Sequence, residues 1–253
     1  MEKNNTELPI FMNNLATSKI FKEIIASIPK NIKIFLVGGA VRNALFYKIF
    51  GKILPQRDYD LLLIGNRDKF VNNLKKKKFV YGKMRRKLKI VLKKKKISKP
   101  KNFSDYVILD ISISKEKSIK KNLKENANFT INTFALPLKE VFSKNWSKKI
   151  ISLPNALPDL KNKIIRINKL SHPANLYACL RFMSQGFKKP TKKEINDLLI
   201  SLNKLEKYRF LKNVNKVFNY VGGEEKARQL AKRLGLKENI FNFKVVKKLQ
   251  GSN

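Results

Sequence analysis

The sequence is poor in the residues that cross-link a fold or bind soft metals. It contains one cysteine, Cys179, and one histidine, His172. A single cysteine excludes an internal disulfide, and one cysteine with one histidine cannot supply the ligands of a structural zinc site. Any metal ion bound by this chain must therefore be held by carboxylates.

The sequence also lacks an apolar run of the roughly 18 residues that suggest a transmembrane helix. Its first segment, MEKNNTELPIFMNN, has neither the basic and apolar regions of a signal peptide nor the Arg-rich, acid-poor character of a transit peptide. We therefore expect a soluble, cytoplasmic protein. A hydrophobic fraction of 43%, with 17 Phe, is enough to form a core and argues against overall disorder.

Acidic residues are scarce. There are 18 Asp plus Glu against 57 Lys plus Arg, a formal net charge of +39. This charge predicts a polyanionic partner, with nucleic acid as the first candidate, because each Lys or Arg side chain near a phosphate releases condensed counterions. The abundance of Lys, Ile, Asn and Phe is also typical of an AT-rich genome, so compositional drift contributes to the total charge. The position of the charge along the chain is therefore more informative than its sum.

Basic residues concentrate between positions 75 and 101, where fifteen Lys or Arg occur without an acid. Phe79, Tyr81 and Leu88 interrupt this run. One interpretation is a solvated β-hairpin whose lysines protect an exposed edge from aggregation. The other is a surface that follows an RNA backbone, with aromatic residues available to stack on bases. In that second case the RNA-binding residues would be Lys75, Lys76, Lys77, Lys78, Arg85, Arg86, Lys93 and Lys94.

The hydrophobic periodicity changes once along the chain. Up to about residue 170, apolar residues at helical spacing alternate with short strand-like runs. After Pro173 the apolar residues recur every three or four positions and no strand pattern follows. We expect an α+β fold with a mixed β-sheet domain over residues 1–170 and a small all-helical domain over residues 171–253. The predicted helices of the first domain are 11–29, 41–51 and 69–76, and the predicted strands are 32–37, 59–64, 79–81, 88–92 and 106–113.

A glycine pair follows the first predicted strand. The segment from Phe35 to Ile64 reads FLVGGAVRNALFYKIFGKILPQRDYDLLLI. Gly38 and Gly39 at a strand-to-helix turn would let a phosphate approach the backbone, and the N-terminus of the next helix offers unpaired N–H groups. Arg42, one turn into that helix, could reach the same anion.

An acid pair follows in the same segment. Asp58 and Asp60 are two residues apart at the start of a strand, so their side chains project on one face of the sheet. Two such carboxylates can hold Mg²⁺, which prefers one or two carboxylates together with substrate phosphates. Each motif alone is weak, but their order and spacing together form a specific signal.

These motifs resemble the head domain of the class II tRNA nucleotidyltransferase and bacterial poly(A) polymerase family, in which Gly-Gly-x-x-Arg is followed by Asp-x-Asp. Three later segments are similar to the family's RRDFTINALA, GGLxDLKNKIIR and EDPLRxLRAxRFAAxxGF stretches. They are NFTINTFAL (128–136), PNALPDLKNKIIRI (154–167) and HPANLYACLRFMSQGF (172–187). The resemblance covers about residues 30–190 and extends through the head domain into part of a helical neck.

The resemblance implies a nucleotidyltransferase-type head domain that transfers a nucleoside monophosphate from ATP or CTP to the 3′ end of an RNA, most simply a tRNA. It implies Mg²⁺ as cofactor, held by Asp58 and Asp60 as catalytic residues. Asp110, in the segment ILDIS, is a candidate third metal ligand, although acids at strand ends are more often structural. The implied nucleotide-binding residues are Gly38, Gly39, Arg42 and Asn132.

The chain departs from the family at its base-selecting positions. Asn126, Ala127 and Asn128 stand where the family has Arg-Arg-Asp. The family's Glu-Asp-x-x-Arg element is replaced so that Asn175 takes the place of the base-reading arginine. An asparagine can still hydrogen-bond a base edge and bind nucleotide, but it lacks the charged fork of arginine. His172 is compatible with a base contact or with a structural role.

Three functions follow from this pattern. The first is an active, Mg²⁺-dependent RNA nucleotidyltransferase with relaxed nucleotide choice. The second is a catalytically eroded homologue that binds RNA or a ribonucleoprotein. The third is a nucleotidyltransferase that acts on another acceptor. Dependence of binding on Mg²⁺ and a nucleoside triphosphate would favour the first over the second.

Overall fold

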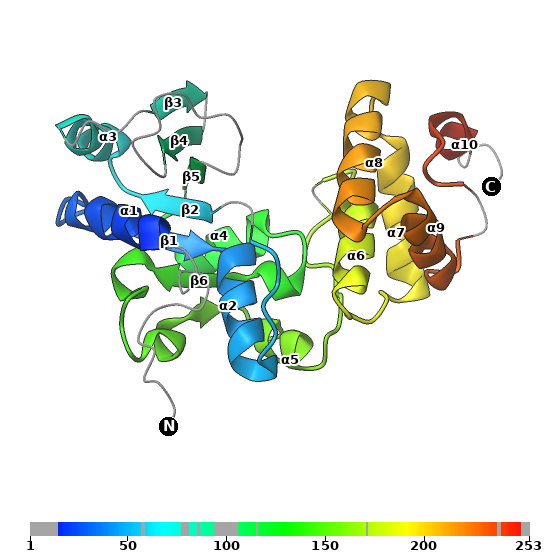
Figure 1. Cartoon of the computed structure of the whole chain (residues 1–253), viewed down its shortest axis with the longest axis horizontal. Helices are drawn as coiled ribbons and strands as arrows, with labels where there is room; N and C mark the ends of the chain where they lie inside the picture. The colour runs from blue at the N-terminus through cyan, green and yellow to red at the C-terminus, as the bar shows by residue number, and fades with distance from the viewer. Residues whose placement is uncertain are drawn as a thin grey trace. The chain divides into compact units, whose positions relative to one another are not determined.

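The computed structural model describes residues 15–56, 59–76, 81–84, 87–93, 106–114, 116–170, 172–236 and 239–248. They form an α+β sheet region followed by helices (Figure 1). The elements of the first part are α1 (Leu15–Ala26), β1 (Lys33–Val37), α2 (Gly39–Phe50), β2 (Tyr59–Ile64), α3 (Arg67–Lys76), β3 (Tyr81–Met84), β4 (Lys87–Lys93), β5 (Tyr106–Ile113), α4 (Ile119–Asn126), η3 (Thr130–Asn132), β6 (Phe134–Pro137), η4 (Leu138–Glu140), η5 (Trp146–Lys149) and β7 (Ile151–Ser152). The later helices are α5 (Ala156–Lys161), α6 (Asn175–Ser184), α7 (Lys192–Asn203), α8 (Lys207–Val221), α9 (Glu224–Arg233) and α10 (Phe243–Lys248).

One mixed sheet organises the first part of the chain. Its strand order is β3-β4-β5-β2-β1-β6-β7, and β2 and β5 are parallel while the other neighbours are antiparallel. The interior strand β1 is buried on both faces, since Ile34, Phe35 and Leu36 are all buried. Its continuous apolar run is therefore the pattern of a covered strand rather than of a half-exposed one.

The core of the sheet region forms on both sides of β1 and β2. Phe35 and Leu62 lie opposite each other in register and cluster with Leu123 and Ala135. Helix α2 packs against β1, β2 and β6 with a run of buried side chains from Ala40 to Phe46. This packing places the start of α2 at the end of β1, where the glycine pair lies.

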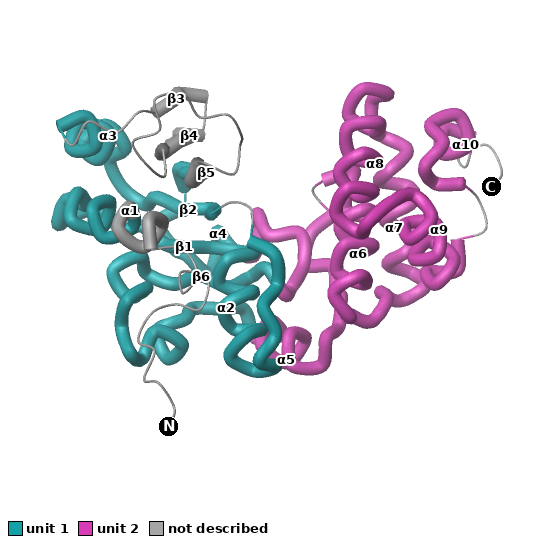
Figure 2. The backbone as a smooth tube through the Cα atoms, viewed as in Figure 1, with its two compact units in different colours: residues 1–123, 132–153 teal, residues 124–131, 154–253 magenta. Residues whose placement is uncertain are grey.

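The chain divides into two compact units (Figure 2). The first comprises residues 1–123 and 132–153, and the second comprises residues 124–131 and 154–253. The boundary predicted at residue 170 therefore lies inside the second unit. The physical reason is packing: the Lys188 N–H donates to the Lys163 carbonyl at 2.7 Å and Glu194 accepts the Ile167 N–H, while the ring of Phe129 contacts that of Phe182 on α6, with centroids 5.3 Å apart. Periodicity does not reveal this contact because it joins a loop to a helix 53 positions later.

The second unit has an aromatic core. Tyr177 on α6 stacks on Phe241 and contacts Phe210 edge-on, and its hydroxyl donates to the carbonyl of Ile240 at 2.8 Å. Cys179 is fully buried on the same helix, and burial raises the pKa of its thiol, so it is a core residue rather than a nucleophile.

The predicted elements are largely confirmed where the structure describes them. The strands expected at 32–37, 59–64, 88–92 and 106–113 correspond to β1, β2, β4 and β5, and the helical character after Pro173 is confirmed. The short strands β6 and β7 were not predicted. The third predicted strand, 79–81, overlaps β3 only at Tyr81, and residues 79–80 lie outside the described part. None of the described helices is both long and apolar enough to cross a membrane.

Candidate active site

The glycine pair forms a turn that links β1 directly to α2. Gly38 has φ 67° and ψ −127°, a conformation that side-chain-bearing residues rarely adopt. Its N–H donates to the Phe134 carbonyl at 3.0 Å, and its carbonyl accepts from the Arg42 N–H at 3.0 Å. A Cβ at Gly38 would meet no atom of the described residues within 4 Å. Backbone conformation, not crowding, therefore requires glycine here, and the space beside the turn is open.

Arg42 is a buried arginine held by two amide side chains. It is 7% exposed, and its Nη1 donates to Asn132 Oδ1 at 2.5 Å. Its Nε and Nη2 donate to Asn43 Oδ1 at 3.2 and 2.9 Å. The predicted nucleotide-binding residues Arg42 and Asn132, 90 positions apart, are thus brought together, and the guanidinium is fixed close to Gly39.

Asn43 extends this network to the loop that precedes the acid pair. Its Nδ2 donates to the Pro55 carbonyl at 3.2 Å and to Gln56 Oε1 at 2.9 Å. Asn43 is buried, at 4% exposed. It therefore couples the orientation of Arg42 to the position of the loop leading to β2. Asn43 could not be predicted as a site residue, because an asparagine inside a helix carries no motif signal.

Asp60 and Asp110 are neighbours in the sheet. They are register partners in the parallel pair β2 and β5, so their side chains project from the same face. Asp60 is exposed while Tyr59 and Leu61 on either side are buried, and Asp110 is partly exposed. In the antiparallel pair with β1, Asp60 lies opposite Val37, the residue before Gly38. The sheet thus places two carboxylates in the row that ends at the glycine turn.

Asp58, the other predicted catalytic residue, lies outside the described residues. So do Lys77, Lys78, Arg85, Arg86 and Lys94 of the predicted RNA-binding set. Of the remainder, Lys75 and Lys76 are exposed in the last turn of α3, and Lys93 is the last residue of β4. Tyr59 is a buried core residue, and its burial raises the pKa of its phenol to about 12.

The donor set fits a hard divalent cation. Adjacent strands lie about 4.8 Å apart, so carboxylates at paired positions can share one ion. Asp60 is open to solvent, as a ligand that must also meet substrate phosphates has to be. No group of three or more His, Cys, Asp or Glu side chains with metal-binding geometry occurs among the described residues, a set from which Asp58 is missing.

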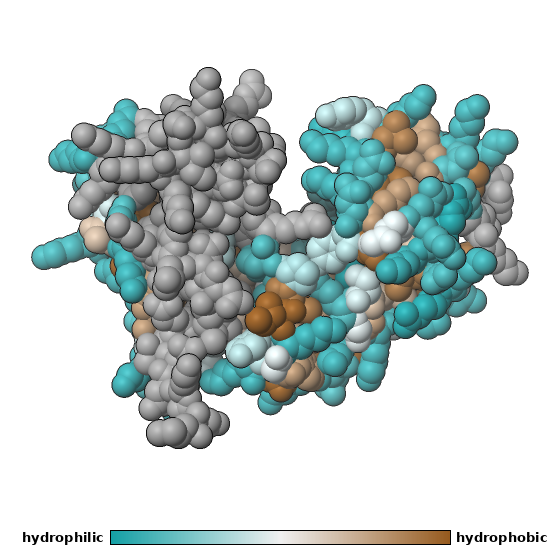
Figure 3. All heavy atoms as spheres, viewed as in Figure 1, coloured by the Kyte–Doolittle hydropathy of each residue, from teal (hydrophilic) through white to brown (hydrophobic). Residues whose placement is uncertain are grey.

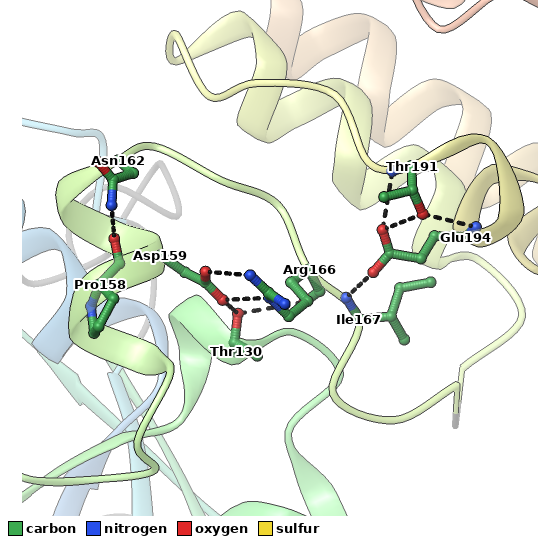
Figure 4. Close-up of polar contacts among 8 residues, drawn as sticks. All are labelled: Thr130, Pro158, Asp159, Asn162, Arg166, Ile167, Thr191 and Glu194. Atoms are coloured by element: carbon green, nitrogen blue, oxygen red, sulfur yellow. Dashed lines mark hydrogen bonds and ion pairs between the residues drawn. The ribbon is translucent and has the colours of Figure 1, made fainter.

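A buried carboxylate in the second unit joins Thr130 to the segment 154–167 (Figure 4). Both belong to the stretches named above for their resemblance to the nucleotidyltransferase family. Asp159 on α5 is 2% exposed and accepts from Thr130 Oγ1 at 2.6 Å. Arg166 donates to the same carboxylate from Nε and Nη2, at 3.0 and 3.1 Å. The Thr130 N–H donates to the Arg166 carbonyl at 3.0 Å. The Thr130, Asp159 and Arg166 positions therefore have a structural role.

Asn175, predicted to bind nucleotide, is the first residue of α6 and is 3% exposed. Its Nδ2 has no hydrogen-bond partner among the described residues. His172, three residues earlier, is exposed, and its Nδ1 accepts from the Ala174 N–H at 3.1 Å. Partial burial, followed by the charges of Arg209 and Lys216, lowers the pKa of His172. Asn175 and His172 belong to the second unit, whereas Gly38, Arg42 and Asp60 belong to the first.

The structure is similar to those of CCA-adding enzymes. It aligns with the Thermotoga maritima CCA-adding enzyme in complex with tRNA at a TM-score of 0.61 and 20% identity, over 90% of this chain and 52% of that one. For a CCA-adding enzyme in complex with CTP the TM-score is 0.59 at 20% identity, over 89% of this chain and 50% of that one. For a tRNA-processing enzyme without ligand the values are 0.64 and 19%, over 94% of this chain and 63% of that one.

These similarities identify the fold, and the chain spans about half the length of the first two enzymes. No protein-family model matches the sequence, and no curated protein sequence matches it significantly.

Proposed function

We propose that this chain, with the fold of the CCA-adding enzymes, is a Mg²⁺-dependent nucleotidyltransferase that adds nucleotides from ATP or CTP to the 3′ end of an RNA, most simply a tRNA. One observation carries the proposal. The open Gly38–Gly39 turn lies at the end of the strand whose last residue, Val37, is paired with Asp60, and Asp60 is paired in turn with Asp110. The turn proposed to bind phosphate and the two carboxylates therefore lie along one row across β1, β2 and β5.

The turn would bind the triphosphate. Space beside Gly38 is open, and the first turn of α2 contains no acidic residue that would repel an anion. Backbone N–H groups and the positive end of the helix dipole stabilise a phosphate at such a position. Arg42 would orient the triphosphate, because its guanidinium is fixed by Asn43 and Asn132 rather than free to rotate.

The carboxylates would hold the metal. Asp58 and Asp60 are the proposed catalytic ligands, and Asp110 is the proposed third, on the basis of its register with Asp60. When bound, Mg²⁺ would lower the pKa of the attacking 3′-hydroxyl and neutralise the charge of the leaving pyrophosphate. The chain's own residues would hold the reacting groups in the geometry of an in-line displacement. The hydrogen-bond donors of the glycine turn and of Arg42 would be in position before the substrate binds.

The acceptor is proposed from charge and from the relatives. The structurally similar enzymes include complexes with tRNA, CTP and ATP. The net charge of +39 and the basic run of residues 75–101 suit contact with an RNA backbone, with the exposed Lys75 and Lys76 at its start. Phosphate contacts position an RNA without reading its sequence, so acceptor choice would be broad.

Nucleotide choice is proposed to be relaxed. Asn175 offers an amide where the family that this chain resembles has its base-reading arginine, and Ala178 offers a methyl group where the same segment of the family, EDPLRxLRAxRFAAxxGF, has its next arginine. An amide makes single, uncharged hydrogen bonds, and discrimination between bases falls when a bidentate charged contact is absent.

The test is incorporation of each labelled nucleoside triphosphate into bulk tRNA that lacks its 3′ end, with Mg²⁺. We expect incorporation by the wild type and its loss to background in the Asp58→Ala/Asp60→Ala double variant. Asp68→Ala removes an exposed acid in the first turn of α3 and is the matched control, which should retain incorporation. Absence of incorporation in the wild type, with salt-sensitive RNA binding intact, would favour the non-catalytic RNA-binding function instead.

A further inference from the structure

Asn43 is a polar side chain inside the first unit. Polar side chains usually lie at the surface, and on the face drawn in Figure 3 the second unit carries mainly hydrophilic side chains. Asn43 is instead 4% exposed. A buried polar group needs hydrogen-bond partners, and the partners of this amide lie in two directions.

The amide of Asn43 uses all of its hydrogen-bonding groups. Its Oδ1 accepts from Arg42 Nε and Nη2, at 3.2 and 2.9 Å. Its Nδ2 donates to the Pro55 carbonyl at 3.2 Å and to Gln56 Oε1 at 2.9 Å. Since an amide has one acceptor oxygen and two N–H donors, the set is complete. A buried and fully bonded amide is held in one orientation.

The chemistry of these partners explains why an asparagine is needed here. The Arg42 guanidinium only donates and the Pro55 carbonyl only accepts, so the residue between them must accept on one side and donate on the other. Leucine, of similar size, can do neither. Aspartate can accept from the guanidinium but has no N–H for the carbonyl. The same chemistry determines which end of the amide is the oxygen.

The loop that this amide holds leads directly to the acid pair. Gln56 is three residues before Tyr59, which is buried and contacts Phe21 edge-on with ring centroids 5.1 Å apart. In sequence, Asp58 therefore lies between two held positions, Gln56 and Tyr59. Because so few residues separate them, a displacement of Gln56 would shift the chain at Asp58.

The guanidinium at the other side of the amide lies at the glycine turn. Arg42 Nη2, which donates to Asn43, is also the atom that a Cβ at Gly39 would meet at 3.5 Å. Arg42 Nη1 donates to Asn132 Oδ1. One amide thus connects the turn proposed to bind the triphosphate with the loop that precedes the proposed metal ligands, and all of these residues belong to the first unit.

We propose that Asn43 is a positioning residue for both halves of the candidate active site. Through its oxygen it orients Arg42 toward a bound triphosphate. Through its nitrogen, by way of Gln56, it sets the position of Asp58. The inference rests on the proposed function for the identity of the two ligands. Loss of this amide should weaken the binding of a triphosphate and of a divalent cation, although the amide would contact neither.

Two equilibrium measurements examine the two halves separately. The affinity for labelled ATP, measured by equilibrium dialysis with EDTA, reports on Arg42. The affinity for Mn²⁺ without nucleotide, measured from the EPR signal of the free ion, reports on the carboxylates, since Mn²⁺ and Mg²⁺ prefer the same oxygen ligands. In Asn43→Leu both affinities should fall by about tenfold, because the hydrogen bonds on both sides of the amide are lost.

Two further variants divide the effect. Gln56→Met removes an acceptor of the loop and keeps the bonds between Asn43 and Arg42, so the affinity for Mn²⁺ should fall while that for ATP is retained. Asn43→Asp keeps an acceptor for both guanidinium nitrogens, so the affinity for ATP should return to nearly the wild-type value. General destabilisation of the fold would not produce this split between the two affinities.

Asn122→Leu is the matched control. Asn122 is also a buried asparagine of the first unit, at 8% exposed, but it lies on α4 and its Nδ2 donates to Ser114 Oγ at 3.0 Å. Its replacement should lower stability toward urea, as Asn43→Leu does, and should leave both affinities at the wild-type values.

The outcomes are independent of nucleotide incorporation. Unchanged affinities in Asn43→Leu, equal losses in Asn122→Leu, or a wild type that binds neither ligand would overturn the positioning role, even if the wild type incorporates nucleotides. Loss of both affinities in Asn43→Leu, with ATP binding retained in Gln56→Met and restored in Asn43→Asp, would support the role even if no incorporation is found.

Discussion

Gly38 and Gly39 are adjacent glycines, yet they have different roles in the fold. Gly38 has a positive φ of 67°, which strains any residue with a side chain, although space around it is open. Gly39 begins α2 with an ordinary backbone, and a Cβ there would lie 3.5 Å from Arg42 Nη2, an ordinary contact distance. The first glycine is therefore required by the backbone, and the second leaves room beside the guanidinium.

We predict that Gly38→Ala lowers the free energy of unfolding by about 1–3 kcal/mol, the cost of a strained backbone conformation. Gly39→Ala should change stability by less than about 1 kcal/mol, since alanine favours a helix and its Cβ would make only an ordinary contact with Arg42 Nη2. Urea unfolding of both variants beside the wild type gives the comparison. Equal destabilisation by the two substitutions would contradict the assignment of strain to Gly38.

At the scale of elements, a buried carboxylate joins segments that are distant in sequence. Asp159 on α5 accepts from Thr130 at the start of η3 and from Arg166 in the following loop. Glu194 continues this arrangement: its Oε2 caps α7 by accepting from the Thr191 N–H, while its Oε1 accepts the Ile167 N–H at 2.9 Å. Side chains rather than a regular sheet thus join Thr130, α5 and α7 within the second unit.

We predict that Arg166→Ala lowers the free energy of unfolding by about 2 kcal/mol. It leaves the Asp159 carboxylate buried with fewer partners, although exposure of about half of Arg166 reduces the loss. Arg228→Ala is the matched control, since Arg228 is similarly exposed and also pairs with a carboxylate, but that of Glu224 is 52% exposed whereas that of Asp159 is 3% exposed. Arg228→Ala should lower the free energy of unfolding by about 0.5 kcal/mol or less. Thermal unfolding of the two variants checks the difference, which should vanish if burial of Asp159 is unimportant.

At the scale of the whole molecule, charge is the dominant property. With a net charge of +39, the positively charged side chains repel one another within the folded chain and attract polyanions over long distances. Lys75 and Lys76 are exposed in the last turn of α3, where cations also suit the negative end of the helix dipole. Their position has a structural advantage and leaves both ammonium groups available to RNA.

We predict that RNA affinity falls steeply with salt. For about four contacted phosphates on a single strand, log K should fall with log salt at a slope of about −3, or about fiftyfold between 50 and 200 mM. Lys75→Gln/Lys76→Gln should reduce the slope by about 1 to 1.5. Fluorescence anisotropy with a labelled oligoribonucleotide measures both slopes. An unchanged slope in this variant would remove these lysines from the interface.

Much of the local structure and the choice of candidate residues could be derived from the sequence. Period-3.6 and strand-like apolar runs identified most of the described helices and the four longest strands, and the Gly-Gly-x-x-Arg and Asp-x-Asp motifs selected the site. These signals are local, because helix periodicity and turn chemistry depend on neighbouring residues. The short strands β6 and β7 escaped prediction since four and two residues are too few to show a period.

The tertiary structure alone decided which distant residues meet. The register of β2 and β5 places Asp110 beside Asp60, the packing of α2 brings Arg42 to Asn132, and Asn43 reaches the loop at Pro55 and Gln56. The place of residues 124–131 in the second unit likewise reflects the contact of Phe129 with Phe182. Such pairings depend on strand order, on register and on side-chain packing between residues far apart in the sequence. No local periodic pattern in a single sequence encodes them.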